Sequence, residues 1–283
     1  MITILESINL SSEFLKNKGI ESPRVNAELL LAHILKCKRL DLYLSFEKPL
    51  AEEELEKYRD LLKRRIKFEP LQYIIGKVEF YGIDFKVNPS VLIPRQETEI
   101  LVGTILEQYK NNDSVNILDI GTGSGNIAIS LAKNLNNLFV TAIDISEDAL
   151  NTASENASMN SVNEKIEFIK IDFLKEEFNR NDFDVVVSNP PYVSIEEFKT
   201  LSPELKIYEP KVALTDYNSG LRFYNIISEK SNYLLKTGGK LYFEIGKGQY
   251  PNVSEIMGKN NFWNITVIKD YQNIERVISG EKI

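Results

Sequence analysis

From Val115 to the C-terminus, short apolar runs rich in β-branched residues alternate with segments of helical periodicity. The runs VNILDI, LFVTAIDI, KIEFIKI, FDVVVSN and GKLYFEIG are predicted strands, and predicted helices begin near Gly125, Ser146 and Gly220. Residues 97–109 form a further predicted helix, and WNITVIKDYQNIERVISG predicts two strands around a polar turn. Apolar strands that alternate with helices indicate an α/β fold, with a parallel sheet covered on both faces.

The first 70 or so residues have a different pattern and are predicted to be helical. Ser22 is a predicted N-cap with Pro23 at the first helical position, and VNAELLLAHILKC then carries apolar residues at helical spacing. An earlier predicted helix ends near Gly19, and a third covers residues 51–69, with acidic residues early and basic residues late, and ends at Pro70. After Pro70, LQYIIGKVEFYGIDFKVN is rich in aromatic and β-branched residues, which predicts short strands in a hairpin.

The composition is that of a globular protein, and it limits both the class of protein and the cellular compartment that we expect. Hydrophobic residues make up 43% and charged residues 27% of the 283 residues, a length that suits one large domain or two ordinary ones. The 41 acidic residues against 34 basic ones disfavour a dedicated duplex binder, because phosphate-neutralising surfaces usually lean basic. The single cysteine, Cys37, fits a reducing compartment, and no stretch approaches the ~18 apolar residues of a membrane span. We therefore expect a soluble, cytoplasmic protein.

The first predicted strand runs into three alternating glycines, in the pattern D-x-G-x-G-x-G. Such glycines let the backbone approach a ligand and turn sharply into a helix, although tight strand–helix packing alone also selects glycine. A dinucleotide fingerprint would need glycine at position 126, where Asn126 stands. An acidic residue beside the turn suits a cationic ligand better than a pyrophosphate, which points to S-adenosylmethionine. The candidate cofactor-binding residues here are Asp119, Gly121, Thr122, Gly123, Ser124 and Gly125.

Two more acidic residues follow predicted strands. Asp144 ends the second strand, 19 residues after the last glycine, an offset at which an acid accepts hydrogen bonds from both ribose hydroxyls. Its alternative role is a helix N-cap, which Ser146 could fill instead; Ile145 is taken with Asp144 as a candidate cofactor contact. Asp172 and Phe173 end the third strand, where an acid and an aromatic ring are placed to hold an adenine amine and ring. The alternative there is an ordinary strand-end turn.

The segment SNPPY closes the fourth predicted strand. Its two prolines stiffen the loop and remove two backbone donors, while the carbonyl acceptors remain. The side-chain oxygen of Asn189 and the carbonyl of Pro190 can each accept a hydrogen bond from one N–H of a planar NH₂ group. The flat face of Tyr192 would lie beside that group. An amide nitrogen held in this way points its lone pair at a methyl carbon, and alignment alone can supply ~7–11 kcal/mol. Asn189, Pro190 and Tyr192 are the candidate catalytic residues, and Pro191 joins them in binding substrate.

DIGTGSG together with NPPY resembles the class I, Rossmann-like methyltransferases that act on planar amino or amide nitrogens. The flanking segments narrow the resemblance: EPLQYIIGKVEFYG, VLIPRQETE, YEP at 208–210, GGKLYFEIGKGQ and KDYQNIERV are similar to the HemK/PrmC family of protein-(glutamine-N5) methyltransferases, in order over roughly residues 69–280. The family's P-R-P-x-T-E segment has Gln96 in place of its second proline, and Phe173 stands where a tryptophan is common.

The resemblance implies a fold and a reaction. The fold is a class I methyltransferase domain with a mostly parallel seven-stranded sheet at 94–283, a helical N-terminal domain at 1–72 and a β-hairpin linker at 73–93. The implied reaction methylates N5 of the glutamine in the Gly-Gly-Gln motif of class I peptide chain release factors, without a metal, and leaves S-adenosylhomocysteine. We expect a monomer with no stable nucleic-acid or membrane partner, whose helical domain helps dock the release factor.

By the same resemblance, Gly121–Gly125, Asp144, Phe173 and Asn189 contact the cofactor, and Asn189–Tyr192 hold the substrate glutamine. Three alternatives stay open: an adenine-N6 nucleic-acid methyltransferase, glutamine methylation of a ribosomal protein, and a non-catalytic S-adenosylmethionine-binding module. His33, the only histidine, lies on an apolar predicted helix, and no metal site can be built around it.

Overall fold

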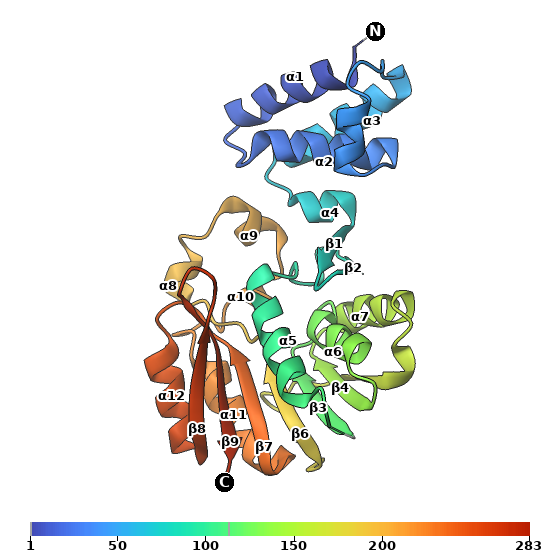
Figure 1. Ribbon diagram of the computed structural model, residues 1–283. Coiled ribbons are helices and arrows are strands. Elements are labelled where there is room, and N and C mark those ends of the chain that lie inside the picture. Colours follow the sequence, from blue (N-terminus) through green and yellow to red (C-terminus); the bar gives the residue numbers. More distant parts are fainter. Residues whose placement is uncertain (1, 113) are drawn as a thin grey trace. The chain divides into compact units, whose positions relative to one another are not determined.

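The computed structural model describes residues 2–112 and 114–283, and Figure 1 shows its elements. The chain forms two compact units. Unit 1 consists of Met1–Gly76 and Pro203–Tyr208, and unit 2 of Lys77–Ser202 and Glu209–Ile283. The sequence predicted a continuous N-terminal domain at 1–72 and a separate linker at 73–93. The units instead include a distant segment in unit 1 and the hairpin in unit 2.

Unit 1 is built from helices that meet in one buried apolar core. Its elements are α1 (Ile4–Asn17), α2 (Pro23–Leu35), the 3₁₀ helix η1 (Arg39–Leu44), α3 (Glu52–Arg65), α4 (Leu71–Ile75) and α9 (Pro203–Tyr208). The late segment α9 is tied to this unit by a salt bridge between Arg65 and Glu204. In addition, the hydroxyl of Tyr208 donates to the backbone carbonyl of Lys67 at 3.0 Å.

One local prediction in unit 1 holds in part and one is wrong. Ser22 is the N-cap residue of α2 and Pro23 begins that helix, as predicted, but Ser22 has a left-handed backbone (φ 46°) and its side chain makes no capping hydrogen bond. The predicted strand at the start of LQYIIGKVEF is the helix α4, which follows Pro70 and ends at Gly76 in a left-handed conformation (φ 82°). A short apolar run does not distinguish a strand from a buried helix, and here burial of Tyr73 and Ile74 selects the helix.

Unit 2 contains a seven-stranded sheet in the order β5-β4-β3-β6-β7-β9-β8. Its strands are β3 (Val115–Ile120), β4 (Leu138–Asp144), β5 (Ile166–Lys170), β6 (Phe183–Ser188), β7 (Leu235–Glu244), β8 (Phe262–Lys269) and β9 (Glu275–Lys282). The first five are parallel, while β9 runs antiparallel to both β7 and β8. The predicted class I methyltransferase architecture, with its mostly parallel sheet, is confirmed.

Helices cover both faces of this sheet, as Figure 1 shows for unit 2. The remaining elements are the hairpin β1 (Lys77–Phe80) and β2 (Ile83–Lys86), α5 (Gln96–Tyr109), α6 (Asn126–Asn134), α7 (Glu147–Met159), η2 (Asn163–Lys165), α8 (Ile195–Phe198), α10 (Lys211–Leu214), α11 (Arg222–Leu234) and α12 (Tyr250–Lys259). Side chains alternate between two buried cores along each strand: Ile117 packs with α5 and α6, and Leu118 packs with α11 and α12. Among the described helices, none has the length and apolar character to cross a membrane.

The strand order places a topological switch point between β3 and β6. From β3 the chain moves outward through β4 and β5, then returns to pair β6 with the other edge of β3. At the carboxyl ends of these two strands, Ile120 and Ser188 are register partners, and the Ser188 hydroxyl donates to the Ile120 carbonyl at 2.7 Å. In open parallel sheets this is where ligands bind, because the loops that follow the two strands diverge. The glycine turn and NPPY are those two loops.

Candidate active site

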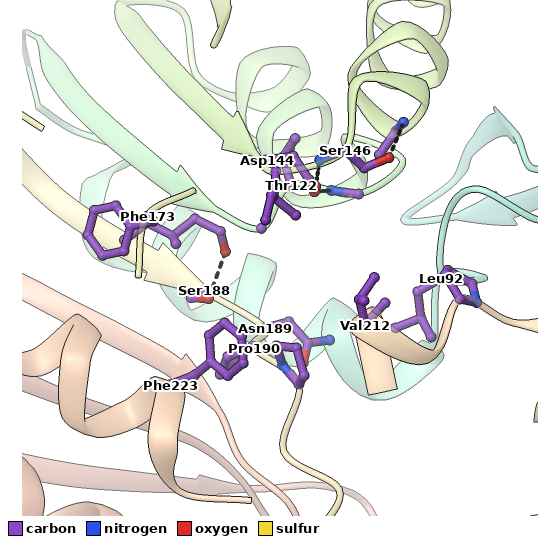
Figure 2. Close-up of a pocket in the computed structure, with 18 of the residues that line it drawn as sticks. Leu92, Thr122, Asp144, Ser146, Phe173, Ser188, Asn189, Pro190, Val212 and Phe223 are labelled. Carbon is purple, nitrogen blue, oxygen red and sulfur yellow. Dashed lines mark hydrogen bonds between the residues drawn. The ribbon is translucent and has the colours of Figure 1, made fainter. Parts of the chain in front are cut away.

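A cavity of about 470 Å³ lies at the carboxyl ends of β3 to β6, within unit 2, and its volume is that of a small-ligand site. Most of the predicted site residues line it: Gly121, Thr122, Gly123, Ser124, Asp144, Ile145, Asp172, Phe173, Asn189, Pro190 and Pro191. Figure 2 shows Thr122 and Asp144 on one side of the cavity and Asn189 and Pro190 on the other. Asp119, Gly125 and Tyr192 are predicted site residues that do not line it.

The three glycines of the turn have different physical roles. All three have positive φ angles, of 76° at Gly121, 56° at Gly123 and 79° at Gly125. A Cβ atom at Gly121 or Gly123 would meet nothing within 4 Å, so the backbone there is open for a ligand to approach. At Gly125 a Cβ would lie 2.8 Å from Cδ1 of Ile129 and 3.1 Å from Cβ of Ala153, so this glycine has a role in the close packing of α6 and α7. Packing thus accounts for Gly125, whereas ligand binding at Gly121 and Gly123 stays a prediction that the open space there permits.

Asp119 lies beneath the turn and is completely buried. The Thr122 hydroxyl donates to its Oδ2 at 2.7 Å, whereas Oδ1 has no hydrogen-bond partner among the described residues. Burial raises the pKa of Asp119 to about 7, because it disfavours the charged form. A buried carboxylate oxygen without a donor is unusual, and it leaves a hydrogen-bond acceptor directly under the glycine turn.

Asp144 fixes the glycine turn from the neighbouring strand. Its Oδ2 accepts from the Gly123 N–H at 2.9 Å and its Oδ1 from the Ser146 N–H at 2.9 Å. The hydroxyl of Ser146 caps α7 by accepting from the Ala149 N–H, so the capping role does not fall to Asp144. Each carboxylate oxygen of Asp144 retains a further lone pair, and the residue lines the cavity. Ribose binding thus remains a role that its position allows.

Asp172 and Phe173 lie just past β5 and both line the cavity. The carboxylate of Asp172 pairs with Lys175 at 2.8 Å and accepts from the Leu174 N–H, and the hydrogen bond from Lys175 lowers its pKa. These are the hydrogen bonds of a strand-end turn. The ring of Phe173 is buried, and Nζ of Lys230 lies 4.8 Å from its centroid. Adenine binding by these two residues stays a prediction.

The NPPY segment begins at the end of β6 and faces the glycine turn. Nδ2 of Asn189 donates to the Thr98 hydroxyl at 3.2 Å, and no described residue donates to its Oδ1. Tyr192 packs partly buried against the α11–α12 side of the sheet. Its hydroxyl donates to Glu244 at 3.4 Å, and burial raises the pKa of that hydroxyl, which keeps it protonated. The flat face that the sequence assigned to Tyr192 is therefore not part of the cavity lining.

Sequence reasoning missed Thr98, Glu244 and Glu209. Thr98 and Glu244 share a hydrogen bond at 2.6 Å, and both are almost fully buried. Glu209 is also buried and holds Arg95, a cavity-lining residue, by a salt bridge at 2.5 Å. A charged residue inside the apolar run LYFEI was the one signal in the sequence that could have flagged Glu244.

Gln96 stands where the family's P-R-P-x-T-E segment has its second proline, and its position in the structure is compatible with either residue. Gln96 is the first residue of α5, the position at which proline is favoured because its missing N–H and fixed φ suit a helix start. A glutamine is compatible with that position. The preceding residues are held independently of any proline, because Glu209 accepts from both the Ile93 N–H and the Arg95 guanidinium.

Comparisons with known proteins agree with this geometry. Two family models match the chain, a PrmC N-terminal domain at residues 6–76 and a methyltransferase domain at residues 111–278. The chain is 42% identical to a release factor glutamine methyltransferase of Fusobacterium nucleatum subsp. nucleatum. The match includes 98% of this chain and 78% of that protein. The chain is 40% identical, over 98% of its length, to a protein of that name from Chlorobaculum tepidum, of which it covers 96%. A solved methyltransferase from Pyrococcus furiosus shares the fold, with a TM-score of 0.53, 19% identity, and coverage of 81% of this chain and 98% of that one.

Proposed function

The chain belongs to the release factor glutamine methyltransferase family, and we propose that it methylates a glutamine side-chain amide of class I peptide chain release factors with S-adenosylmethionine as donor. The resemblance described above identifies that glutamine as the one in the Gly-Gly-Gln motif. The observation that carries the proposal is the position of Asn189, whose amide oxygen is unengaged across the cavity from the glycine turn.

The residues present fit S-adenosylmethionine. Gly121 and Gly123 leave the backbone open to a ligand, and the unpartnered oxygen of Asp119 together with the Asp144 carboxylate supplies negative charge beside them. A cationic cofactor is favoured by such a turn, whereas a pyrophosphate would be repelled. In the proposed site Gly121, Thr122, Gly123, Asp144, Phe173 and Asn189 hold the cofactor, with Ser124, Ile145 and Asp172 completing its surroundings. When bound, S-adenosylmethionine supplies a methyl carbon made electrophilic by the attached sulfonium.

The NPPY loop contributes by orienting the substrate amide toward the methyl donor. Oδ1 of Asn189 and the carbonyl of Pro190 accept hydrogen bonds from the two N–H groups of the substrate amide. Pro191 has no backbone N–H, so it offers no competing donor to this acceptor pair. The nitrogen lone pair, otherwise delocalised into the carbonyl, is then turned toward the electrophilic carbon. No base is needed before attack, because the nitrogen becomes acidic only after it is methylated. Most of the acceleration is thus assigned to alignment.

Glutamine is favoured over adenine, although the acceptor pair suits either NH₂ group. The relatives from Fusobacterium nucleatum and Chlorobaculum tepidum, which match 98% of the chain, carry the name release factor glutamine methyltransferase. The formal net charge of −7 does not favour a polyanionic substrate. Since the substrate acts in translation, we place the enzyme in the cytoplasm.

Unit 1 is proposed to dock the release factor. It carries no catalytic motif, and two leucines of the same short helix η1, Leu40 and Leu44, are 76% and 87% exposed. Exposed apolar residues that are grouped are typical of protein interaction sites. Replacing both by serine is expected to lower kcat/KM for the intact release factor while leaving methylation of a short Gly-Gly-Gln peptide unchanged. Lys57→Ser, on the exposed face of α3, is the matched control. An equal loss on both substrates would contradict docking by this surface.

The decisive test of the reaction uses the purified protein, isotopically labelled S-adenosylmethionine and candidate class I release factors. Peptide fragmentation should locate one added methyl group on the glutamine of the Gly-Gly-Gln motif, and a release factor with alanine at that position should stay unlabelled. Methylation of an adenine-containing oligonucleotide, or of another glutamine, would overturn the proposal.

A further inference from the structure

Glu244 is a buried carboxylate with no part in the reaction described so far. It is the last residue of β7, it is 1% exposed, and the apolar residues Phe243 and Ile245 precede and follow it in the chain. Its Oε2 accepts from the Thr98 hydroxyl at 2.6 Å and its Oε1 from the Tyr192 hydroxyl at 3.4 Å. Burying a carboxylate costs free energy unless hydrogen-bond donors satisfy it. Packing alone therefore does not explain a glutamate at this position.

The hydrogen bond to Glu244 fixes the direction of the next one. A threonine hydroxyl has a single proton, and Thr98 donates it to Glu244. The Thr98 oxygen can then only accept a further hydrogen bond, and the group within reach, at 3.2 Å, is the Asn189 amide. That amide must turn its NH₂ group toward Thr98, which leaves Oδ1 on the opposite side. An ionised Glu244 therefore determines which end of the Asn189 amide is free.

We propose that Glu244 is a positioning residue that acts through Thr98 to present the oxygen, and not the NH₂ group, of Asn189 to the substrate amide. This inference rests on the proposed function, in which Asn189 accepts a hydrogen bond from the substrate NH₂ group. With the amide turned over, two NH₂ groups would face each other, and neither could accept. The substrate would lose one of the two acceptors that direct its lone pair.

Protonation of Glu244 reverses the direction of the hydrogen-bond relay that runs from Asn189 through Thr98 to Glu244. A neutral Glu244 can donate to Thr98, whose proton is then free to go to Asn189, and the amide turns over. Burial raises the pKa of Glu244 to about 7. Several groups face this carboxyl: Thr98 and Glu97 on α5, Tyr192 after β6, Arg276 on β9, and Tyr224 on α11, whose hydroxyl donates to the backbone carbonyl of Glu244. Arg276 and the two hydroxyl donors lower the pKa, and Glu97 raises it.

The test compares Glu244→Gln, Thr98→Val and Thr98→Ser with the unmodified enzyme, using an intact class I release factor and saturating S-adenosylmethionine. Glutamine keeps the shape of Glu244 but has one acceptor oxygen for two donors, so it cannot hold the relay in one direction. We expect kcat to fall about 10- to 100-fold in Glu244→Gln and Thr98→Val, as when the outer partners of a site are removed. Thr98→Ser, which keeps the hydroxyl, should retain most of the activity.

The pH profile separates positioning from a merely structural role. In the unmodified enzyme kcat should fall as the pH drops through about 7, and Glu244→Gln should lack this step. Asp119 also has a pKa of about 7, but it lies under the glycine turn, so its protonation should change the Kd of the cofactor and not kcat at saturation. Cofactor Kd and the unfolding midpoint, measured for each variant, report whether the fold and the cofactor site are intact.

The outcomes are distinct. A Glu244→Gln enzyme with unchanged kcat and an unchanged pH profile would overturn the positioning role while the proposed function stood. The same holds if Thr98→Val and Thr98→Ser have equal kcat. An unmodified enzyme that leaves the release-factor glutamine unmethylated would overturn both.

Discussion

Oδ2 of Asp144 accepts a hydrogen bond from the backbone N–H of Gly123 at 2.9 Å, so the acid at the end of β4 holds the turn that follows β3. The same carboxylate lines the cavity. One side chain thus couples the shape of the glycine turn to the place where a ribose would bind. An acceptor at this position therefore shapes the glycine turn even before a ligand arrives.

Replacing Asp144 by alanine should mainly weaken cofactor binding. The change removes the acceptor for the Gly123 N–H and the acceptor proposed for the ribose hydroxyls, which together should raise the cofactor Kd about 10- to 100-fold, at ~1.5–3 kcal/mol for hydrogen bonds to a charged group. Titration calorimetry measures that Kd, and kcat at saturating cofactor should change less. Lost turnover with an unchanged Kd would contradict the ribose role.

Replacing Asn189 by alanine should mainly slow the chemistry. The change removes one preorganised contact to the substrate amide, for which a loss on the order of 10²–10³ in kcat is expected. Cofactor binding should weaken less than turnover, because Asn189 is one cofactor contact among several and the glycine turn and Asp144 lie on the other side of the cavity. Asn181→Ala, at an exposed asparagine before β6, is the control. Near-normal turnover in Asn189→Ala would show that the acceptor pair does not orient the substrate.

Alanine at two of the turn glycines should separate binding from stability. At Gly121 the new Cβ meets no atom within 4 Å, so the cost to folding is the left-handed backbone alone, about 1–2 kcal/mol, and the main effect is weaker cofactor binding. At Gly125 the Cβ also lies 2.8 Å from Ile129 and 3.1 Å from Ala153, which adds about 1–3 kcal/mol of overpacking. Urea unfolding should therefore find Gly125→Ala the less stable variant. Equal unfolding free energies would contradict the packing role.

The buried carboxyl of Asp119 should make the ligand-free protein less stable as the pH rises. Its pKa is raised from 3.8 to about 7, so between these values the folded state binds more protons than the unfolded state. The free energy of unfolding then falls with increasing pH. Asp119→Asn lacks this titration, and its stability relative to the unmodified protein should improve by roughly 2–3 kcal/mol between pH 5 and pH 8. A pH-independent difference between the two proteins would refute the shifted pKa.

Much of the fold could be predicted because its signals are local. The strand VNILDI, the turn glycines and the prolines of NPPY impose their conformations through neighbours in the chain, and the predicted strands β3 to β9 all form. The switch point follows from the order of those strands, which is why most predicted site residues reach one cavity.

Only the tertiary structure decided the partners of these groups. Thr98 and Glu244 are 146 positions apart, and α9 joins the N-terminal unit from a segment more than a hundred residues later. The helix α4 forms where the sequence favoured a strand, because burial of Tyr73 and Ile74 outweighs a weak local preference. Local sequence determines the backbone conformation and which functional groups each segment carries. Which buried donor meets which buried acceptor depends on packing between distant segments, since desolvation penalises every polar group that folding leaves without a partner.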